Sequence, residues 1–90
     1  MKVRISRPAG RDLQRIVRHV AQDRPQAALK LYDRIIETGK SLGVFPLLGH
    51  ELSTRSRCLP VSRTPYNIIY RVSKTEIVIL RIRHAAQNWR

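Results

Sequence analysis

The stretch "YNIIYRVSKTEIVILRIRH", which runs from Tyr66 to His84, decides the fold expected for this chain. Two runs rich in β-branched and aromatic residues, "YNIIYRV" and "EIVILRI", are separated only by the polar residues "SKT". Runs of this composition and length are typical of strands, and so short a separation is typical of a β-hairpin. The sequence therefore predicts two antiparallel strands joined by a tight turn.

Alternation of side chains along a strand predicts the two faces of this hairpin. If Ile68 and Tyr70 face the core, a three-residue loop pairs Val72 with Glu76 and Tyr70 with Val78. The core face then carries Ile68, Tyr70, Val72, Val78, Leu80 and Ile82. The opposite face carries Asn67, Ile69, Arg71, Ile77, Ile79, Arg81 and Arg83. We therefore expect one buried face and one basic, partly apolar surface that points away from the core.

Upstream of the hairpin the apolar pattern changes to a helical period. After "KVRIS", which alternates like a short strand, helices are expected from about Pro8 to Gln22 and from Arg24 to Gly43. The short break between them predicts an antiparallel helical hairpin. "VFPLLGHELSTRS" is expected to be a surface connector and "RCLPV" a further strand. The sequence thus predicts a single α+β domain over residues 1–90, of order βααβββ, with the helical hairpin packed on a small antiparallel sheet.

Charge limits the kinds of partner. Eighteen Lys and Arg stand against six Asp and Glu, which gives a formal net charge of +12. This excess favours an anionic partner, either nucleic acid or an acidic protein segment. Charges recur from the first residues onward and no apolar run reaches about 18 residues, so we expect a cytoplasmic protein with no membrane segment.

Metal and cofactor chemistry find little support in the sequence. Cys58 lies among the apolar residues of "CLPV" and is expected to be a buried structural thiol. His19, His50 and His84 fall on separate elements with no ligand spacing, and the glycines form no phosphate-binding loop. We therefore expect neither a metal nor a cofactor.

The end of the last strand carries the candidates for chemistry or binding. His84 carries an imidazole, the side chain used most often as a base near neutral pH, and it follows Arg81 and Arg83. It is therefore a candidate catalytic base, or alternatively a hydrogen-bonding residue at a strand end. Arg71, on the same face, adds a cation for phosphate or carboxylate groups. Trp89 is expected either to stack on a base or to pack against the sheet edge.

The apolar stripes of the two helices are broader than a small sheet can cover. An exposed apolar patch rimmed by arginines marks a partner site, and an acidic amphipathic segment would fit it. The residues expected to line this groove are Leu13, Val17, Val20, Leu31 and Ile35.

The order of the elements, together with "LPVSRTPYNIIYRV" and "ILRIRHAAQNW", resembles the RelE/ParE superfamily of toxins from type II toxin–antitoxin modules. The resemblance covers nearly the whole chain and is strongest at Asp12-Leu13, in the loop from Pro46 to Gly49, in the run from Tyr66 to Val72 and at His84. It implies a toxin held inactive by a co-expressed acidic antitoxin, which would occupy the groove. It also implies that operator DNA is contacted only through that antitoxin.

Two mechanisms occur in that superfamily. RelE-like members cleave mRNA on the ribosome, where arginines with a lysine, tyrosine or histidine clamp the phosphate and activate the ribose 2′-hydroxyl. The positions that match two of those arginines hold the uncharged Asn67 and Gln87. ParE-like members inhibit DNA gyrase without nuclease residues, and share the Tyr-Arg-Val run at residues 70–72 and the Arg-His pair at residues 83–84.

The resemblance therefore favours a ParE-like gyrase inhibitor over an enzyme. The residues expected to face the target or the antitoxin are Arg71, Arg81, Arg83, Gln87 and Trp89. The runner-up is a ribosome-dependent mRNA endonuclease with His84 as its base, and a third alternative is an inactive toxin that only binds its antitoxin. The chain departs from the family pattern after His84, where Ala85 to Gln87 replace the usual glycine and arginine.

Overall fold

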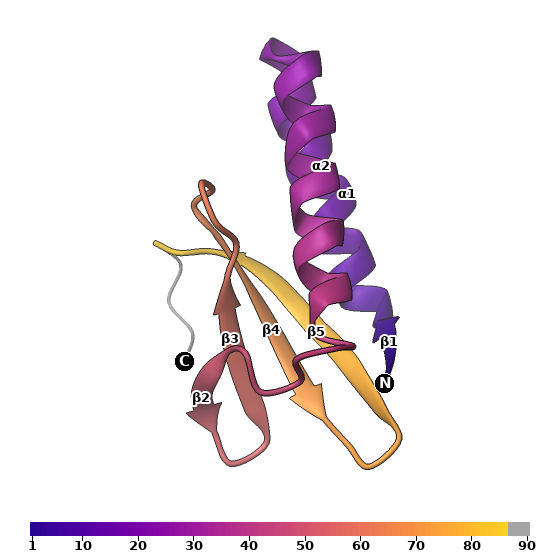
Figure 1. The fold of residues 1–90 in the computed structure, drawn as a ribbon. Coiled ribbons are helices and arrows are strands. Elements are labelled where there is room, and N and C mark those ends of the chain that lie inside the picture. Colours follow the sequence, from indigo (N-terminus) through magenta and orange to yellow (C-terminus); the bar gives the residue numbers. More distant parts are fainter. Residues whose placement is uncertain (87–90) are drawn as a thin grey trace.

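The computed structural model describes residues 1–86, which form two helices and a five-stranded mixed sheet (Figure 1). The elements are β1 (Lys2–Ile5), α1 (Arg7–Asp23), α2 (Pro25–Ser41), β2 (His50–Ser53), β3 (Ser56–Pro60), β4 (Tyr66–Val72) and β5 (Glu76–His84). The strand order is β1-β5-β4-β3-β2, with β1 parallel to β5 and the other neighbours antiparallel. The predicted α+β fold with its helical hairpin is confirmed, although β1 pairs in parallel and part of the expected connector forms the additional strand β2.

The helical hairpin packs on one face of the sheet, and its far end projects beyond the sheet (Figure 1). The core between them contains Ala9, Leu13, Ile16, Ile35, Leu42, Leu59, Val61, Ile68, Tyr70, Ile77, Ile79 and Ile82. In α2, Gly39 leaves room for the side chain of Ile79 on β5, since a Cβ atom at Gly39 would lie only 3.1 Å from Ile79 Cδ1. Neither of the described helices has the length and apolar composition to cross a membrane.

Ser6 joins β1 to α1. Its N–H donates to the Ile79 carbonyl at 3.0 Å, and its Oγ donates to the Leu80 carbonyl at 3.1 Å. The same Oγ accepts the Ala9 N–H at 3.2 Å, which is the side-chain cap of a helix N-terminus. Pro8 lies in the first turn, where a helix does not need the missing N–H. As a result, α1 starts directly alongside β5, at the point where β1 ends.

The predicted pairing of β4 with β5 is wrong by one residue at the turn. Val72 pairs with Ile77 rather than with Glu76. The cause is a two-residue turn, because Ser73 N–H donates to the Glu76 carbonyl at 2.9 Å and Ser73 Oγ accepts the Glu76 N–H at 3.1 Å. A slip of one residue exchanges the two faces of a strand.

The slip exchanges the two faces in the first half of β5. Ile77 and Ile79 belong to the core cluster, where the prediction had placed Val78 and Leu80. Val78 is nevertheless buried, on the opposite face, and Leu80 is half-buried. A β-bulge then ends the exchange, since Tyr70 pairs with Ile79 but the preceding residue of β4 pairs with Arg81. Beyond the bulge the alternation of β5 agrees with the prediction.

One buried hydroxyl fastens the connector between α2 and β2 to the sheet. The Tyr70 side chain is fully buried; its OH donates to the Pro46 carbonyl at 2.9 Å and accepts the Gly49 N–H at 2.9 Å. Gly49 lies so close to β3 that a Cβ atom would be 2.6 Å from the Cys58 carbonyl oxygen. Arg57 Nη2 donates to the Gly49 carbonyl at 2.7 Å. These contacts hold the connector against β3 and β4.

Tyr70→Phe should loosen this connector. The variant leaves the Pro46 carbonyl and the Gly49 N–H without their partner, so we expect the free energy of unfolding to fall by about 1–3 kcal/mol. Urea unfolding measures the loss, and limited proteolysis should cut the connector faster. Tyr32→Phe is the matched control, because the ring of Tyr32 is 44% exposed. If both variants unfold and are cut alike, the hydroxyl does not hold the connector.

Candidate functional site

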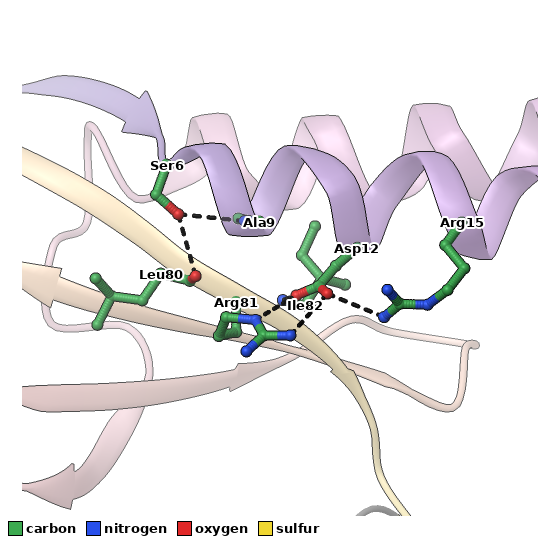
Figure 2. Close-up of polar contacts among 7 residues, drawn as sticks. All are labelled: Ser6, Ala9, Asp12, Arg15, Leu80, Arg81 and Ile82. Atoms are coloured by element: carbon green, nitrogen blue, oxygen red, sulfur yellow. Dashed lines mark hydrogen bonds and ion pairs between the residues drawn. The ribbon is translucent and has the colours of Figure 1, made fainter.

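A buried carboxylate joins α1 to β5 (Figure 2). Asp12 is 1% exposed and accepts hydrogen bonds from Arg81 Nε at 2.7 Å, Arg81 Nη2 at 2.9 Å, the Ile82 N–H at 3.0 Å and Arg15 Nη2 at 3.0 Å. The pairing of β1 with β5 ends at Ile5. Beyond that point the Asp12 carboxylate replaces a neighbouring strand as the acceptor for a backbone N–H of β5.

Burial and hydrogen bonding act in opposite directions on the pKa of Asp12. Burial raises the pKa, because desolvation disfavours the charged form. Hydrogen bonds from Arg81, the Ile82 N–H and Arg15 outweigh burial and lower the pKa from 3.8 to about 2. The carboxylate in turn raises the pKa of Arg81. Asp12 is therefore a structural anion near neutral pH rather than a group that transfers protons.

This pKa predicts a dependence of stability on pH. The pKa of Asp12 is lower in the folded than in the unfolded chain. The ionised carboxylate therefore adds its full contribution to the free energy of unfolding above about pH 5, and this contribution is lost as the pH falls toward 2. Between these limits we expect the wild type to lose about 2 kcal/mol more stability than Asp12→Asn. Urea unfolding over a pH series measures both proteins. Parallel pH curves for the two would contradict the low pKa.

The predicted surface cations lie in three different settings. The Arg81 side chain is held by Asp12, so it is not the free surface cation that the sequence indicated. Arg71 is exposed on β4, and Arg83 is half-buried on β5 opposite Asn67. Among these three guanidinium groups, Arg71 is thus the most accessible to a partner.

The role of Asp12 was not predicted from the sequence, where this residue stood out only as part of the family resemblance. The signal that could have found it is spacing. Asp12 follows Ala9 by three residues and precedes Ile16 by four, which places the carboxylate on the buried side of α1. A carboxylate in that position needs a cation from the sheet.

His84 lines a cleft between α1 and the sheet. Its ring stands at 84° to that of Tyr66, with the centroids 5.4 Å apart, and its Nδ1 accepts the Ala86 N–H at 3.1 Å. The cleft has a volume of about 260 Å³ and is lined by Arg15, Ile16, His19, Tyr66, Ile82 and His84. It brings together two imidazoles, a phenol and a guanidinium. His84 was a candidate from the sequence, but its proximity to Arg15 and His19 of α1 was not predicted.

The predicted apolar groove on the helices is mostly covered. Leu13 and Ile35 are buried in the core, while Val17, Val20 and Leu31 are half-buried. Large apolar side chains that are more than half exposed gather elsewhere, in the connector after α2. They are Val44, Phe45, Leu47 and Leu48, with exposed fractions of 73%, 61%, 67% and 53%. We refer to these four residues as the apolar loop.

An open groove lies next to the apolar loop. It has a volume of about 690 Å³ and is lined by Leu48, Leu59 and Pro60 together with polar residues of α2. The side chains of the apolar loop are more exposed than those of the helical stripe. A surface of this kind marks a binding site for another protein.

Two residues expected to face a partner, Gln87 and Trp89, lie outside the described residues. Within residues 1–86, no three His, Cys, Asp or Glu side chains come together as a metal site. Cys58 is buried, and burial raises the pKa of its thiol. This agrees with the structural thiol expected from the sequence.

Comparison with known proteins gives consistent matches over almost the whole chain. Residues 3–89 match the family model described as "ParE toxin of type II toxin-antitoxin system, parDE". The protein Y4kP of Sinorhizobium fredii (strain NBRC 101917 / NGR234) is 33% identical over 89 residues, which cover 98% of this chain and 92% of that protein.

Solved structures of two toxin–antitoxin systems share the fold. A chain of the chromosomal ParDE system from P. aeruginosa is 32% identical, with a TM-score of 0.84 and coverage of 93% of this chain and 95% of that chain. A chain of the RelBE2 complex from Mycobacterium tuberculosis is 26% identical, with a TM-score of 0.66 and coverage of 92% of this chain and 95% of that chain. The fold is therefore more similar to the ParDE chain than to the RelBE2 chain.

Proposed function

Since the chain belongs to the ParE family of toxins from type II toxin–antitoxin systems, we propose that it inhibits DNA gyrase. The observation that supports gyrase best is the greater likeness to the ParDE chain than to the RelBE2 chain. The engagement of Arg81 by Asp12 also supports it, because a nuclease would need that cation for phosphate. This function implies a cytoplasmic location, as the sequence predicts.

The partner that controls the toxin is a cognate antitoxin, as in the toxin–antitoxin systems of the similar structures. We propose that this antitoxin is acidic, because it must neutralise a chain of net charge +12. We further propose that it covers the apolar loop and the adjoining groove, and not only the half-buried helical stripe. Burial of the four loop residues would supply the apolar centre of the interface.

Expression in cells tests the proposed target. Inhibition of gyrase predicts relaxed or cleaved plasmid DNA soon after induction, while primer extension shows intact mRNA. Co-expression of the acidic protein encoded next to this chain should restore growth. Codon-positioned mRNA cuts with normally supercoiled plasmid would contradict the gyrase proposal.

The cleft that contains His84 favours one alternative, the ribosome-dependent mRNA endonuclease. Two imidazoles beside a guanidinium provide an acid, a base and a cation for attack by a 2′-hydroxyl. On that alternative His84→Ala and His19→Ala each lower mRNA cleavage at least about 100-fold, whereas His50→Ala, an exposed control on β2, leaves it unchanged. The gyrase proposal expects growth inhibition to survive all three substitutions.

A further inference from the structure

One side of α1 carries an unbroken series of basic and amide side chains. Every exposed residue of α1 from Arg11 to Gln22 is an Arg, a Gln or a His. The acidic residue in that interval, Asp12, is buried and already neutralised by Arg81 and Arg15. From Arg11 to Gln22 the accessible face of α1 therefore carries no exposed acidic side chain, and the exposed Asp23 follows only at the end of the helix.

The second helix shows that this arrangement is not a general property of the surface. The exposed face of α2 mixes both signs, with Lys30, Asp33, Glu37 and Lys40, and Lys40 Nζ lies 3.8 Å from Glu37 Oε1. Exposed apolar residues such as Leu29 interrupt that face as well. An anionic partner that binds through charge would therefore distinguish the exposed face of α1 from that of α2.

Three arginines of α1 form a straight row. At about 100° per residue, Arg7, Arg11 and Arg18 point within about 40° of one another, and they extend over about 17 Å of helix. Within residues 1–86 none of the three makes a hydrogen bond or ion pair to another side chain. Arg15 lies beside the row with a 62% exposed side chain, and a shallow hollow of about 340 Å³ includes Arg11, Arg15 and Arg18. The row presents several guanidinium groups to one extended anion.

The composition of this face decides which kind of anion it fits. Protein interfaces have an apolar centre, and the α1 row has none. Single-stranded nucleic acid is usually held by aromatic side chains that stack on bases, and the exposed part of α1 carries only the ring of His19. Guanidinium and amide groups without apolar neighbours are typical of contacts with the phosphates of a duplex.

We propose that the exposed face of α1 binds the phosphate backbone of duplex DNA, with Arg7, Arg11 and Arg18 as the main contacts. The choice of DNA over RNA rests on the proposed function, since gyrase holds duplex DNA. The row contacts phosphates rather than base edges, so binding is independent of sequence. In the complex with gyrase it would hold the toxin on the DNA segment that the enzyme has bound.

Fluorescence anisotropy with a duplex of about 20 base pairs tests this directly, in the absence of gyrase and at several salt concentrations. In the triple variant Arg7→Gln, Arg11→Gln, Arg18→Gln we expect affinity to fall about 30-fold and the slope of log affinity against log salt to decrease by about 2–3. The matched control carries Lys30→Gln, Arg34→Gln and Lys40→Gln on α2, loses the same charge, and should lose less than about threefold.

Several results would overturn the inference. If the two triple variants lost DNA affinity equally, net charge rather than the α1 row would be responsible for DNA binding. Tighter binding of the α1 face to duplex RNA, to single-stranded DNA or to a Glu-rich peptide would assign it to another partner. A supercoiling assay on the same proteins separates this inference from the proposed function. Gyrase inhibition without DNA binding refutes the α1 site alone, whereas DNA binding without inhibition supports the site and refutes gyrase as the target.

Discussion

Asp12→Ala should lower the free energy of unfolding by about 3–5 kcal/mol. The substitution leaves the Ile82 N–H without its acceptor and leaves the Arg81 guanidinium without its carboxylate, both next to the core. Domains of this size have stabilities of only about 5–15 kcal/mol, so the loss is a large share of the total. Urea unfolding should show it, and the melting temperature should drop by about 15 °C or more.

Two further variants identify the cause of that loss. Arg15→Ala removes an exposed partner of the same carboxylate and should cost less than about 1 kcal/mol, because its side chain is 62% exposed. Arg81→Ala leaves a buried carboxylate with one fewer cation and should be close to Asp12→Ala in effect. If Arg15→Ala were as harmful as Asp12→Ala, the bond between α1 and β5 would not be the source of stability. Replacement of Arg81 is consequently not a neutral surface change, although the sequence had placed Arg81 on the surface that points away from the core.

Phe45→Glu together with Leu47→Glu should weaken antitoxin binding by at least about 100-fold, on the proposal that the antitoxin covers the apolar loop. The two side chains are 61% and 67% exposed, so their replacement should change the stability of the free toxin only slightly. In the complex, each new carboxylate would be buried against an apolar and acidic partner, which is costly. Isothermal titration of the toxin variant with its antitoxin measures the change.

A matched control distinguishes the effect of the position on the surface from the effect of an added carboxylate. Leu29→Glu introduces the same carboxylate at an equally exposed position, 62%, on α2. It should change the affinity less than about threefold. Should Leu29→Glu weaken binding as strongly as the loop variant, the antitoxin would lie along the helical hairpin, as the sequence first suggested, and the apolar loop would not be its main contact.

The sequence predicted the elements of the fold better than the contacts between them. Periodicity placed α1, α2, β4 and β5 within a few residues of their observed bounds, because helical and strand periods are properties of the local chain. The register of β5 could not be predicted in the same way. It depends on the Ser73 turn and on the bulge at Leu80, and both alternative registers place β-branched residues on the core face.

The candidate site was predicted only in part, for a similar reason. His84 and the arginines of β5 were evident from their types and positions. Their partners, Asp12 for Arg81 and His19 and Arg15 for the His84 cleft, come from α1, far away in the sequence. The connector that begins "VFPLL" was correctly expected at the surface. That its apolar side chains are exposed could not be predicted, because this depends on the path of the connector over the sheet.

Supercoiling by purified gyrase in the presence of increasing toxin tests the central proposal most directly. We expect loss of supercoiling with accumulation of cleaved DNA, and restoration of activity by stoichiometric antitoxin. Asp12→Ala should inhibit only in proportion to the fraction that remains folded. Unchanged supercoiling at toxin concentrations that stop growth in cells would contradict gyrase as the target and would direct attention to the His84 cleft and the ribosome.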